Sequence, residues 1–190
     1  MIRVALVGDV GSGKSYISNL FGYPVFNADI EVSKIYQNDR KCYLKLKKTF
    51  QKEEFSFPIK KEELARCILS NTNNLRKISK IVHPIVRKKL NLFLKGNNKK
   101  KCVVLDVPLY LENKLNVKGD IIVFIKSKKL EVEKRLKKRR GFNSKLLKLF
   151  RNLQLPLNRK KKMSKFIINN NFTKKNVIKE ISRVKSEIEI

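Results

Sequence analysis

The sequence is poor in several residue types that define whole classes of protein. It has no tryptophan, one histidine and three cysteines in 190 residues. Cys42, Cys67 and Cys102 are odd in number and far apart, which argues against a disulfide framework or a CxxC zinc site. A histidine-rich metal site is excluded by the single histidine. No apolar run approaches the roughly 18 residues that a membrane span needs.

The chain also lacks the pattern of a secretory signal. Its apolar start, Met1 to Val7, is short and ends at Gly8-Asp9. We therefore expect a cytosolic protein without membrane association. The length suits one domain with a small insertion, and 42% hydrophobic residues are enough for a real core. We expect a monomer, with an oligomer as the alternative.

Acidic residues are scarce, since 16 Asp and Glu stand against 46 Lys and Arg, a net charge of +30. Such a charge suggests nucleic-acid binding. However, the chain has 35 Lys but only 11 Arg, together with 18 Asn and 18 Ile. Lys, Asn and Ile share codons built only from A and T, so an AT-rich genome accounts for the excess. Arginine, whose planar guanidinium binds phosphate and guanine with two hydrogen bonds where lysine offers a point charge, is not enriched. We expect no specific nucleic-acid partner.

Short apolar segments alternate with helical patterns along the chain. Helical spacing follows the first strand and covers the middle of the chain, where a new helix is expected to begin near Pro84. A basic helix is expected from about 129 to 140. The five segments typical of buried parallel strands are 3–7, 24–26, 102–106, 121–125 and 166–168.

This alternation predicts a three-layer α/β/α fold on a five-stranded parallel sheet. The helical stretch from about 34 to 97 is too long for an ordinary crossover, so we interpret it as an inserted subdomain. The core then comprises about 1–33, 98–135 and 163–190.

One motif carries specific chemistry. Residues 8–15 match G-x-x-x-x-G-K-[ST] in full, after a buried strand and before a helix. Backbone N–H groups of such a loop bind the phosphates of ATP, and Gly11 and Gly13 let the backbone approach them. Lys14 would reach the β- and γ-phosphates and Ser15 would bind Mg²⁺. The alternative is a glycine-rich turn with a chance lysine, and the acidic Asp9 counts against ideal ATP binding.

Two aspartates stand at strand ends, where open α/β sheets bind ligands. Asp29 follows the second strand and would orient or deprotonate an attacking hydroxyl. Its alternative role is a helix N-cap. Asp106 ends the third strand and would hold Mg²⁺ through water, or it is a buried capping residue. The N-K-x-D of a GTPase is missing, because residues 113–116 lack the final Asp.

Further short motifs occur in order along nearly the whole chain. Together with the phosphate loop they resemble the dephospho-CoA kinase family, the ATP-dependent enzymes of the last step of coenzyme A synthesis. The motifs are 5–15 (family A-L-T-G-G-I-G-S-G-K-S), 25–29 (V-I-D-A-D), His83-Pro84, 107–112 (V-P-L-L-x-E), Arg135 with Arg139 (R-x-x-x-R), 154–156 (Q-x-P) and 168–170 (I-x-N).

The resemblance implies transfer of phosphate from ATP, with Mg²⁺, to the ribose 3′-hydroxyl of dephospho-CoA. It implies that Asp29 acts on that hydroxyl, that the insertion holds dephospho-CoA, and that a lid of about 136–162 closes over ATP. The implied binding residues are Gly11, Ser12, Gly13, Lys14, Ser15, Tyr16 and Asn170 for ATP, and Asp29, Lys61, His83, Pro108 and Leu109 for dephospho-CoA. The departures from the family pattern are Asp9, Tyr16, Asn27, Lys61 and Lys165.

Several basic residues have two interpretations. Arg135 and Arg139 are four apart and would share a helix face, so Arg139 either contacts the transferring phosphate or belongs to a solvated surface. The run 159–162 is interpreted as surface, although Lys160 matches a lid lysine of the family. His83 is either a general base or a capping or packed residue.

Two other functions remain as alternatives at this point. One is another small P-loop kinase that acts on a nucleoside or nucleotide, and the other is a basic nucleic-acid-binding ATPase.

Overall fold

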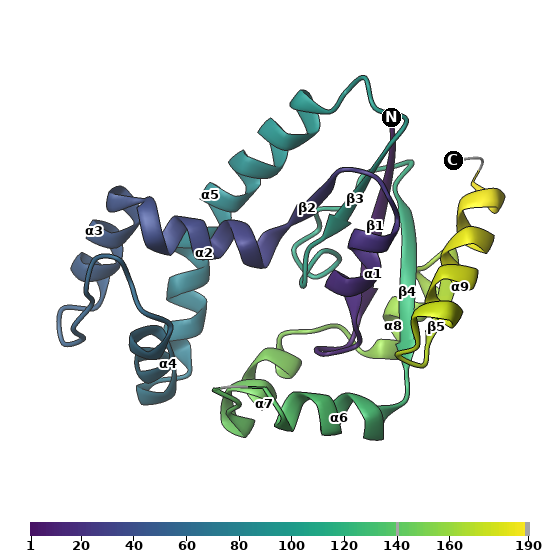
Figure 1. Ribbon diagram of the computed structural model, residues 1–190. Helices are drawn as coiled ribbons and strands as arrows, with labels where there is room; N and C mark the ends of the chain where they lie inside the picture. Colours follow the sequence, from purple (N-terminus) through teal and green to yellow (C-terminus); the bar gives the residue numbers. More distant parts are fainter. Residues whose placement is uncertain (140, 189–190) are drawn as a thin grey trace. The chain divides into compact units, whose positions relative to one another are not determined.

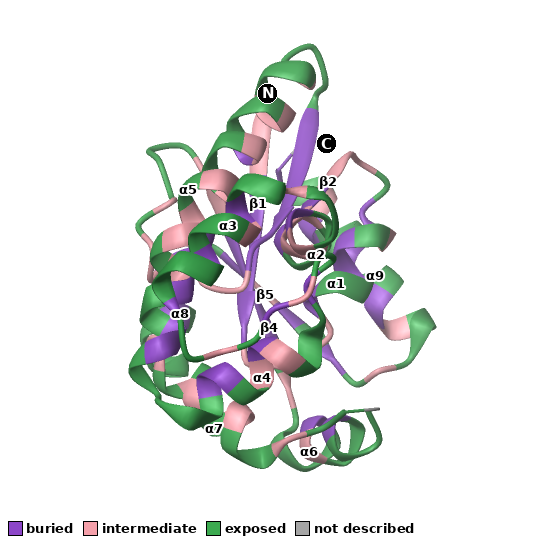
Figure 2. Ribbon diagram, turned by 90° about the vertical axis from the view of Figure 1, so that its left-hand side faces the viewer, coloured by how far each residue is buried: buried purple, intermediate pink, exposed green. Residues whose placement is uncertain are grey.

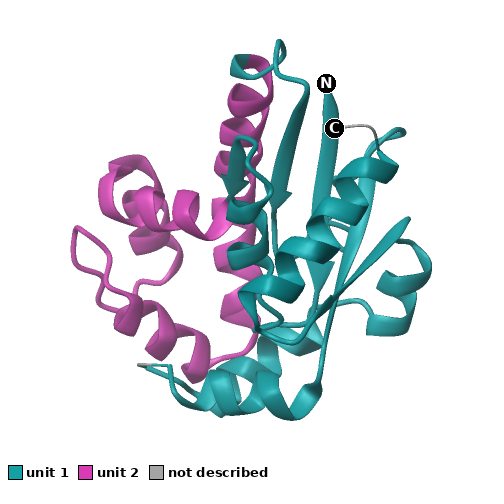
Figure 3. Cartoon of the chain, turned by 45° about the vertical axis from the view of Figure 1, so that its right-hand side comes forward, with its two compact units in different colours: residues 1–27, 96–190 teal, residues 28–95 magenta. Residues whose placement is uncertain are grey.

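The computed structural model describes residues 1–139 and 141–188. The chain divides into two compact units (Figure 3). The first unit comprises residues 1–27 and 96–190, and the second comprises residues 28–95.

The first unit is built on a sheet whose neighbouring strands all run parallel, in the order β2-β3-β1-β4-β5 (Figure 1). The predicted five-stranded parallel sheet is thereby confirmed. Because the strands are parallel, their carboxyl ends meet at one edge, where the phosphate loop begins. The strands are β1 (Ile2–Gly8), β2 (Val25–Asn27), β3 (Cys102–Asp106), β4 (Ile121–Ser127) and β5 (Phe166–Asn170).

Helices cover both faces of this sheet. Val4 and Leu6 of β1 pack into one apolar cluster with α1 (Lys14–Leu20) and α9 (Lys174–Glu187). On the other face, α8 (Leu157–Lys162) contacts β1. Figure 2 shows α8 on one side of the sheet and α1 and α9 on the other. The alternation of β1 side chains between the two faces explains why its central residues are all buried.

Two helices lie between β4 and α8. The first, α6 (Lys129–Lys137), ends three residues before the predicted stop, because Lys138 already takes the C-cap position. The second, α7 (Ser144–Asn152), begins after Asn143, whose side chain accepts a hydrogen bond from the Leu146 amide at 3.0 Å. The helix α8 was not expected from the sequence.

The second unit is helical in the part that the structure describes. Pro84 lies inside α5, so the expectation that a helix begins there is wrong. The buried stripe of Leu75, Ile78, Val82 and Leu90 runs through the whole helix and outweighs the hydrogen bond that proline cannot donate. The helices are α2 (Ala28–Asn38), α3 (Arg40–Thr49), α4 (Lys61–Ser70) and α5 (Asn73–Gly96).

The second unit starts at residue 28, whereas the sequence pattern placed the insertion at about 34 to 97, because α2 follows β2 without a loop. Across both units, no described helix is both long and apolar enough to cross a membrane.

Candidate active site

The phosphate loop joins β1 to α1 with backbone that needs glycine. Gly11 and Gly13 have φ angles of 81° and 93°, a region that side chains rarely adopt. A Cβ on Gly11 would also meet the Leu136 side chain at 2.9 Å, and one on Gly13 would meet the side-chain amide of Asn170. The loop is therefore closely packed and shaped by its own glycines, as a cradle for phosphate requires.

The loop is held to the sheet through one carbonyl. The oxygen of Ser12 accepts hydrogen bonds from Ser127 Oγ at 3.0 Å and from Asn170 Nδ2 at 2.8 Å. Because a trans peptide points its C=O and N–H in opposite directions, the N–H of Gly13 faces away from these donors. Asn170 is 3% exposed and also accepts a bond from the Phe172 amide. It thus positions the loop in this structure.

Lys14 lies against its own loop. Its Nζ donates to the carbonyl of Asp9 at 2.8 Å and approaches that of Gly8 at 3.3 Å, and the side chain is buried. Ser15 and Tyr16, the next residues of α1, are exposed. The ammonium group therefore sits over the loop, where an oligophosphate would bind, and the Ser15 residue is open to solvent.

Asp106 lies at the carboxyl end of β3, the strand beside β1. It is 3% exposed and pairs in register with Asn27 of β2, whose Nδ2 donates to Asp106 Oδ2 at 2.7 Å. An aspartate at position 27 would set two carboxylates against each other, whereas asparagine supplies a donor. This contact gives a physical reason for the departure at position 27.

The oxygen donors suit Mg²⁺. A serine hydroxyl and a carboxylate are hard ligands, and Mg²⁺ is usually held by one or two protein oxygens together with phosphate and water. Ser15 lies in the first turn of α1, after the loop that follows β1, and Asp106 ends the adjacent strand β3, so their oxygens fit such a set. Among residues 1–139 and 141–188 there is no cluster of three or more His, Cys, Asp or Glu that would hold a metal ion by itself.

Asp29 lies in the first turn of α2, two residues after the end of β2. The helix begins at Ala28, so Asp29 is inside it and the N-cap alternative is wrong. A carboxylate in a first turn is favoured by the helix dipole. Pro108 and Leu109 follow β3 in a turn of the first unit and are half-buried.

The other predicted substrate residues lie in the second unit. Lys61 is the exposed first residue of α4, and His83 is half-buried in the middle of α5, so a capping role for His83 is wrong. Burial lowers the pKa of the His83 imidazole, and the nearby Arg87 lowers it further. The imidazole is therefore neutral at pH 7.

The two arginines of R-x-x-x-R differ in their surroundings. The Arg135 guanidinium stacks over the Phe172 ring, 4.4 Å from its centroid. Arg139 is exposed and lies beyond the last helical residue, Lys137. The expectation that the two share one helix face is therefore wrong, because the helix ends between them.

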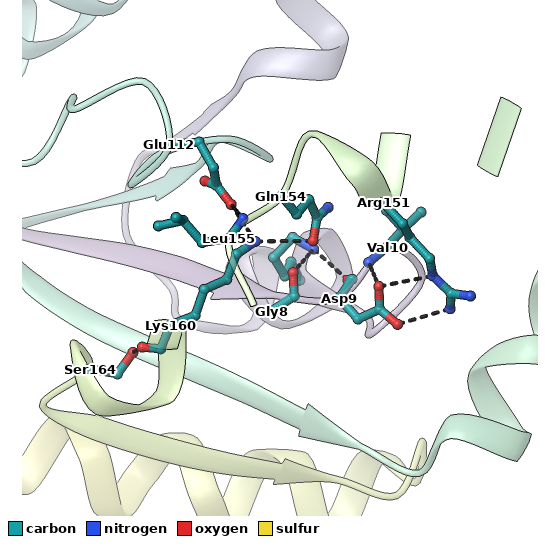
Figure 4. Close-up of polar contacts among 10 residues, drawn as sticks. Gly8, Asp9, Val10, Glu112, Arg151, Gln154, Leu155, Lys160 and Ser164 are labelled. Atoms are coloured by element: carbon teal, nitrogen blue, oxygen red, sulfur yellow. Dashed lines mark hydrogen bonds and ion pairs between the residues drawn. The ribbon is translucent and has the colours of Figure 1, made fainter. Parts of the chain in front are cut away.

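Sequence reasoning missed two ion pairs near the loop. Arg151 pairs with Asp9, and Lys160 pairs with Glu112 at 2.8 Å (Figure 4). Lys160 is 1% exposed and also donates to Gln154 Oε1 at 3.0 Å, so its interpretation as a surface residue is wrong. The signal in the sequence was the scarcity of acidic residues. With 16 Asp and Glu against 46 Lys and Arg, most carboxylates are expected to form ion pairs, although the sequence does not say with which cation.

Glu112→Ala is expected to destabilise the protein by about 3–5 kcal/mol, because it leaves the Lys160 ammonium buried without its counter-charge. Lys160→Met should cost less, because the Glu112 side chain is 10% exposed against 1% for Lys160 and still accepts the hydrogen bond from the Leu155 amide at 2.9 Å. Urea unfolding of both variants measures the difference, with Lys161→Met at an exposed neighbouring position as the control. Equal losses in the two variants would contradict the asymmetry.

Comparisons of the sequence with known proteins show one family. The family model described as dephospho-CoA kinase matches residues 2–176. A dephospho-CoA kinase of Wolbachia sp. subsp. Brugia malayi is 31% identical over 186 residues, which cover 95% of each chain.

Solved structures share the fold. TT1252 from Thermus thermophilus superposes with a TM-score of 0.75 at 22% identity, over 98% of this chain and 97% of the other. A dephospho-CoA kinase from Campylobacter jejuni superposes with a TM-score of 0.66 at 21% identity, over 98% and 96%.

Proposed function

The chain belongs to the dephospho-CoA kinase family, and from this premise we propose that it transfers the γ-phosphoryl group of ATP to the ribose 3′-hydroxyl of dephospho-CoA. The products are coenzyme A and ADP. The observation that carries the proposal is the complete phosphate loop, with Gly11 and Gly13 at positive φ and Lys14 over the loop, in a chain matched to the family from residue 2 to 176.

The phosphate loop binds the β- and γ-phosphates in this proposal. The amides of the loop and of the start of α1 donate to phosphate oxygens, and the Lys14 ammonium turns from its own carbonyls to the transferring group. Asn170 supports the loop through Ser12. Phosphoryl transfer needs mainly positioning and charge neutralisation, and these groups supply both.

Mg²⁺ is the proposed cofactor, and its ligands are the Ser15 hydroxyl and, through water, the Asp106 carboxylate. The ion neutralises charge on the phosphates when it is bound. Asn27 keeps the Asp106 carboxylate in place by its hydrogen bond. Support comes from the oxygen chemistry of the two groups and from their positions, Ser15 in the first turn of α1 after β1 and Asp106 at the end of the neighbouring strand β3.

The acceptor hydroxyl is the proposed partner of Asp29. A carboxylate that accepts the hydroxyl proton orients the oxygen for attack. Support comes from the match of residues 25–29 to the family motif and from the position of Asp29 just after β2. The second unit, with Lys61 and His83, and the turn with Pro108 and Leu109 are assigned to dephospho-CoA.

Residues 136–162 are the proposed lid over ATP. Arg139 is exposed and is assigned to the transferring phosphate. The Lys160–Glu112 pair fixes the C-terminal end of this segment, so the part that moves precedes it. Closure excludes water and limits wasteful hydrolysis of ATP. We propose that the chain works as a monomer in the cytosol.

A coupled assay of ADP release tests the function. We expect turnover with ATP and dephospho-CoA that depends on Mg²⁺ and exceeds the background hydrolysis of ATP. Nucleoside monophosphates serve as the competing acceptors. Turnover with a nucleoside monophosphate, and none with dephospho-CoA, would favour the alternative of another small kinase.

A further inference from the structure

The phosphate loop contains a carboxylate where its ligand is an anion. Asp9 follows Gly8 directly, and its Oδ1 accepts the amide of Val10 at 2.7 Å. Lys14 donates to the backbone oxygen of the same residue. A negative charge at this place opposes the binding of an oligophosphate, because like charges repel across a few ångströms of partly buried protein.

Arg151 contacts that carboxylate with two nitrogens. Its Nη2 lies 2.9 Å from Asp9 Oδ2, and its Nε donates to Oδ1 at 3.3 Å. The side chains are 30% and 20% exposed. This two-point contact is the geometry in which arginine neutralises a carboxylate most effectively. Arg151 belongs to the last turn of α7, 142 residues from Asp9 in sequence, so the contact is made by the fold.

We propose that Arg151 is a positioning residue for ATP, which acts through Asp9 by neutralising its charge and turning its carboxylate toward α7. The inference rests on the proposed function only in that ATP is the ligand of the loop. The pair makes the loop neutral at Asp9 and leaves the charge of Lys14 for the phosphates. Arg151 itself needs no contact with ATP in this role.

A purely mechanical tether between α7 and the loop makes different predictions from charge neutralisation. A tether is lost equally when either residue is replaced, and replacing both gives no recovery. Under charge neutralisation, removing Arg151 leaves a bare carboxylate, removing Asp9 leaves a harmless cation, and removing both restores the balance. The four combinations of two substitutions therefore separate the two explanations.

The substitutions are chosen to preserve shape. Asp9→Asn keeps an oxygen that accepts the Val10 amide, and Arg151→Met keeps the length of the aliphatic stem. Both residues also line an open cleft of about 750 Å³, so water reaches the pair. Because of this solvation we expect a moderate effect, roughly a five- to tenfold change in affinity.

The experiment is calorimetric titration of ATP into the intact chain and its variants at low and high salt. Arg151→Met should raise the dissociation constant of ATP by roughly five- to tenfold at low salt, and high salt should shrink the difference. Asp9→Asn should bind ATP at least as tightly as the unmodified chain, the double variant should recover most of the loss, and Arg151→Lys should retain part of the affinity.

Lys99→Met is the matched control, because it removes one charge from an exposed residue before β3, at the amino edge of the parallel sheet. An unchanged affinity in Arg151→Met, or a double variant as weak as Arg151→Met, would overturn the inference. Turnover with dephospho-CoA is measured in parallel on the unmodified chain. Its absence would contradict the proposed function, while the four affinities would still decide the role of Arg151.

Discussion

Lys14→Ala is expected to abolish most turnover of ATP and dephospho-CoA while the protein stays folded. The Nζ of Lys14 lies over the loop, 2.8 Å from the Asp9 carbonyl, and in the proposed mechanism it follows the charge of the transferring phosphate. Removal of one group that stabilises transition-state charge lowers kcat by about 10²–10³. The ADP-release assay measures this loss, and thermal unfolding reports on the fold.

The fold should survive because the side chain contributes no apolar core. Ile17 of α1 and Phe21, its C-cap residue, pack into the apolar cluster with the sheet. Lys99→Ala serves as the control for the loss of one positive charge, since it lies at the opposite edge of the sheet. A near-normal kcat in Lys14→Ala would contradict the proposed role of the phosphate loop in catalysis.

Asp29→Asn is expected to lower kcat by about 10²–10⁴ and to leave the affinity for ATP unchanged. Asparagine keeps the size of the side chain and loses the group that accepts the hydroxyl proton. Single-turnover kinetics with saturating dephospho-CoA measure the chemical step, and calorimetry measures ATP binding. The split between the two is the signature of a group that acts on the acceptor.

Glu31→Gln is the matched control for Asp29, because Glu31 is the other carboxylate in the first turn of α2. It pairs with Lys34 at 2.7 Å and with Lys89 at 3.2 Å, contacts within the second unit that have no part in the proposed reaction. We expect an ordinary kcat for this variant. A similar loss in both variants would mean that the charge of the helix turn, and not the Asp29 carboxylate, matters.

The sheet and the phosphate loop were predictable because each follows from local signals. Continuous apolar runs such as 102–106 mark buried parallel strands, and the G-x-x-x-x-G-K-[ST] motif needs only its own spacing. The helix around Pro84 was not predictable by the same means. The helix continues through Pro84 because buried apolar residues lie on both sides of the proline, and their tertiary packing stabilises the helix.

The polar contacts around the loop were not predictable because they join distant segments. Lys160 lies in a run of four basic residues, and only the fold brings it to Glu112, 48 residues earlier. Asn27 matched an aspartate of the family, and only the pairing of β2 with β3 explains the amide. The resemblance to the family identified positions 27 and 160. The contacts that these side chains make depend on neighbours that only the fold brings close.

The Asp9–Arg151 pair also constrains the history of the chain. A loop without Asp9 tolerates an arginine at 151, since an extra cation near phosphate does no harm. An intermediate sequence with Asp9 and without Arg151 would have a lower affinity for ATP, according to the proposed role of Arg151. Of the two mutational routes to the present pair, the one in which the arginine arose first avoids an unfit ancestor.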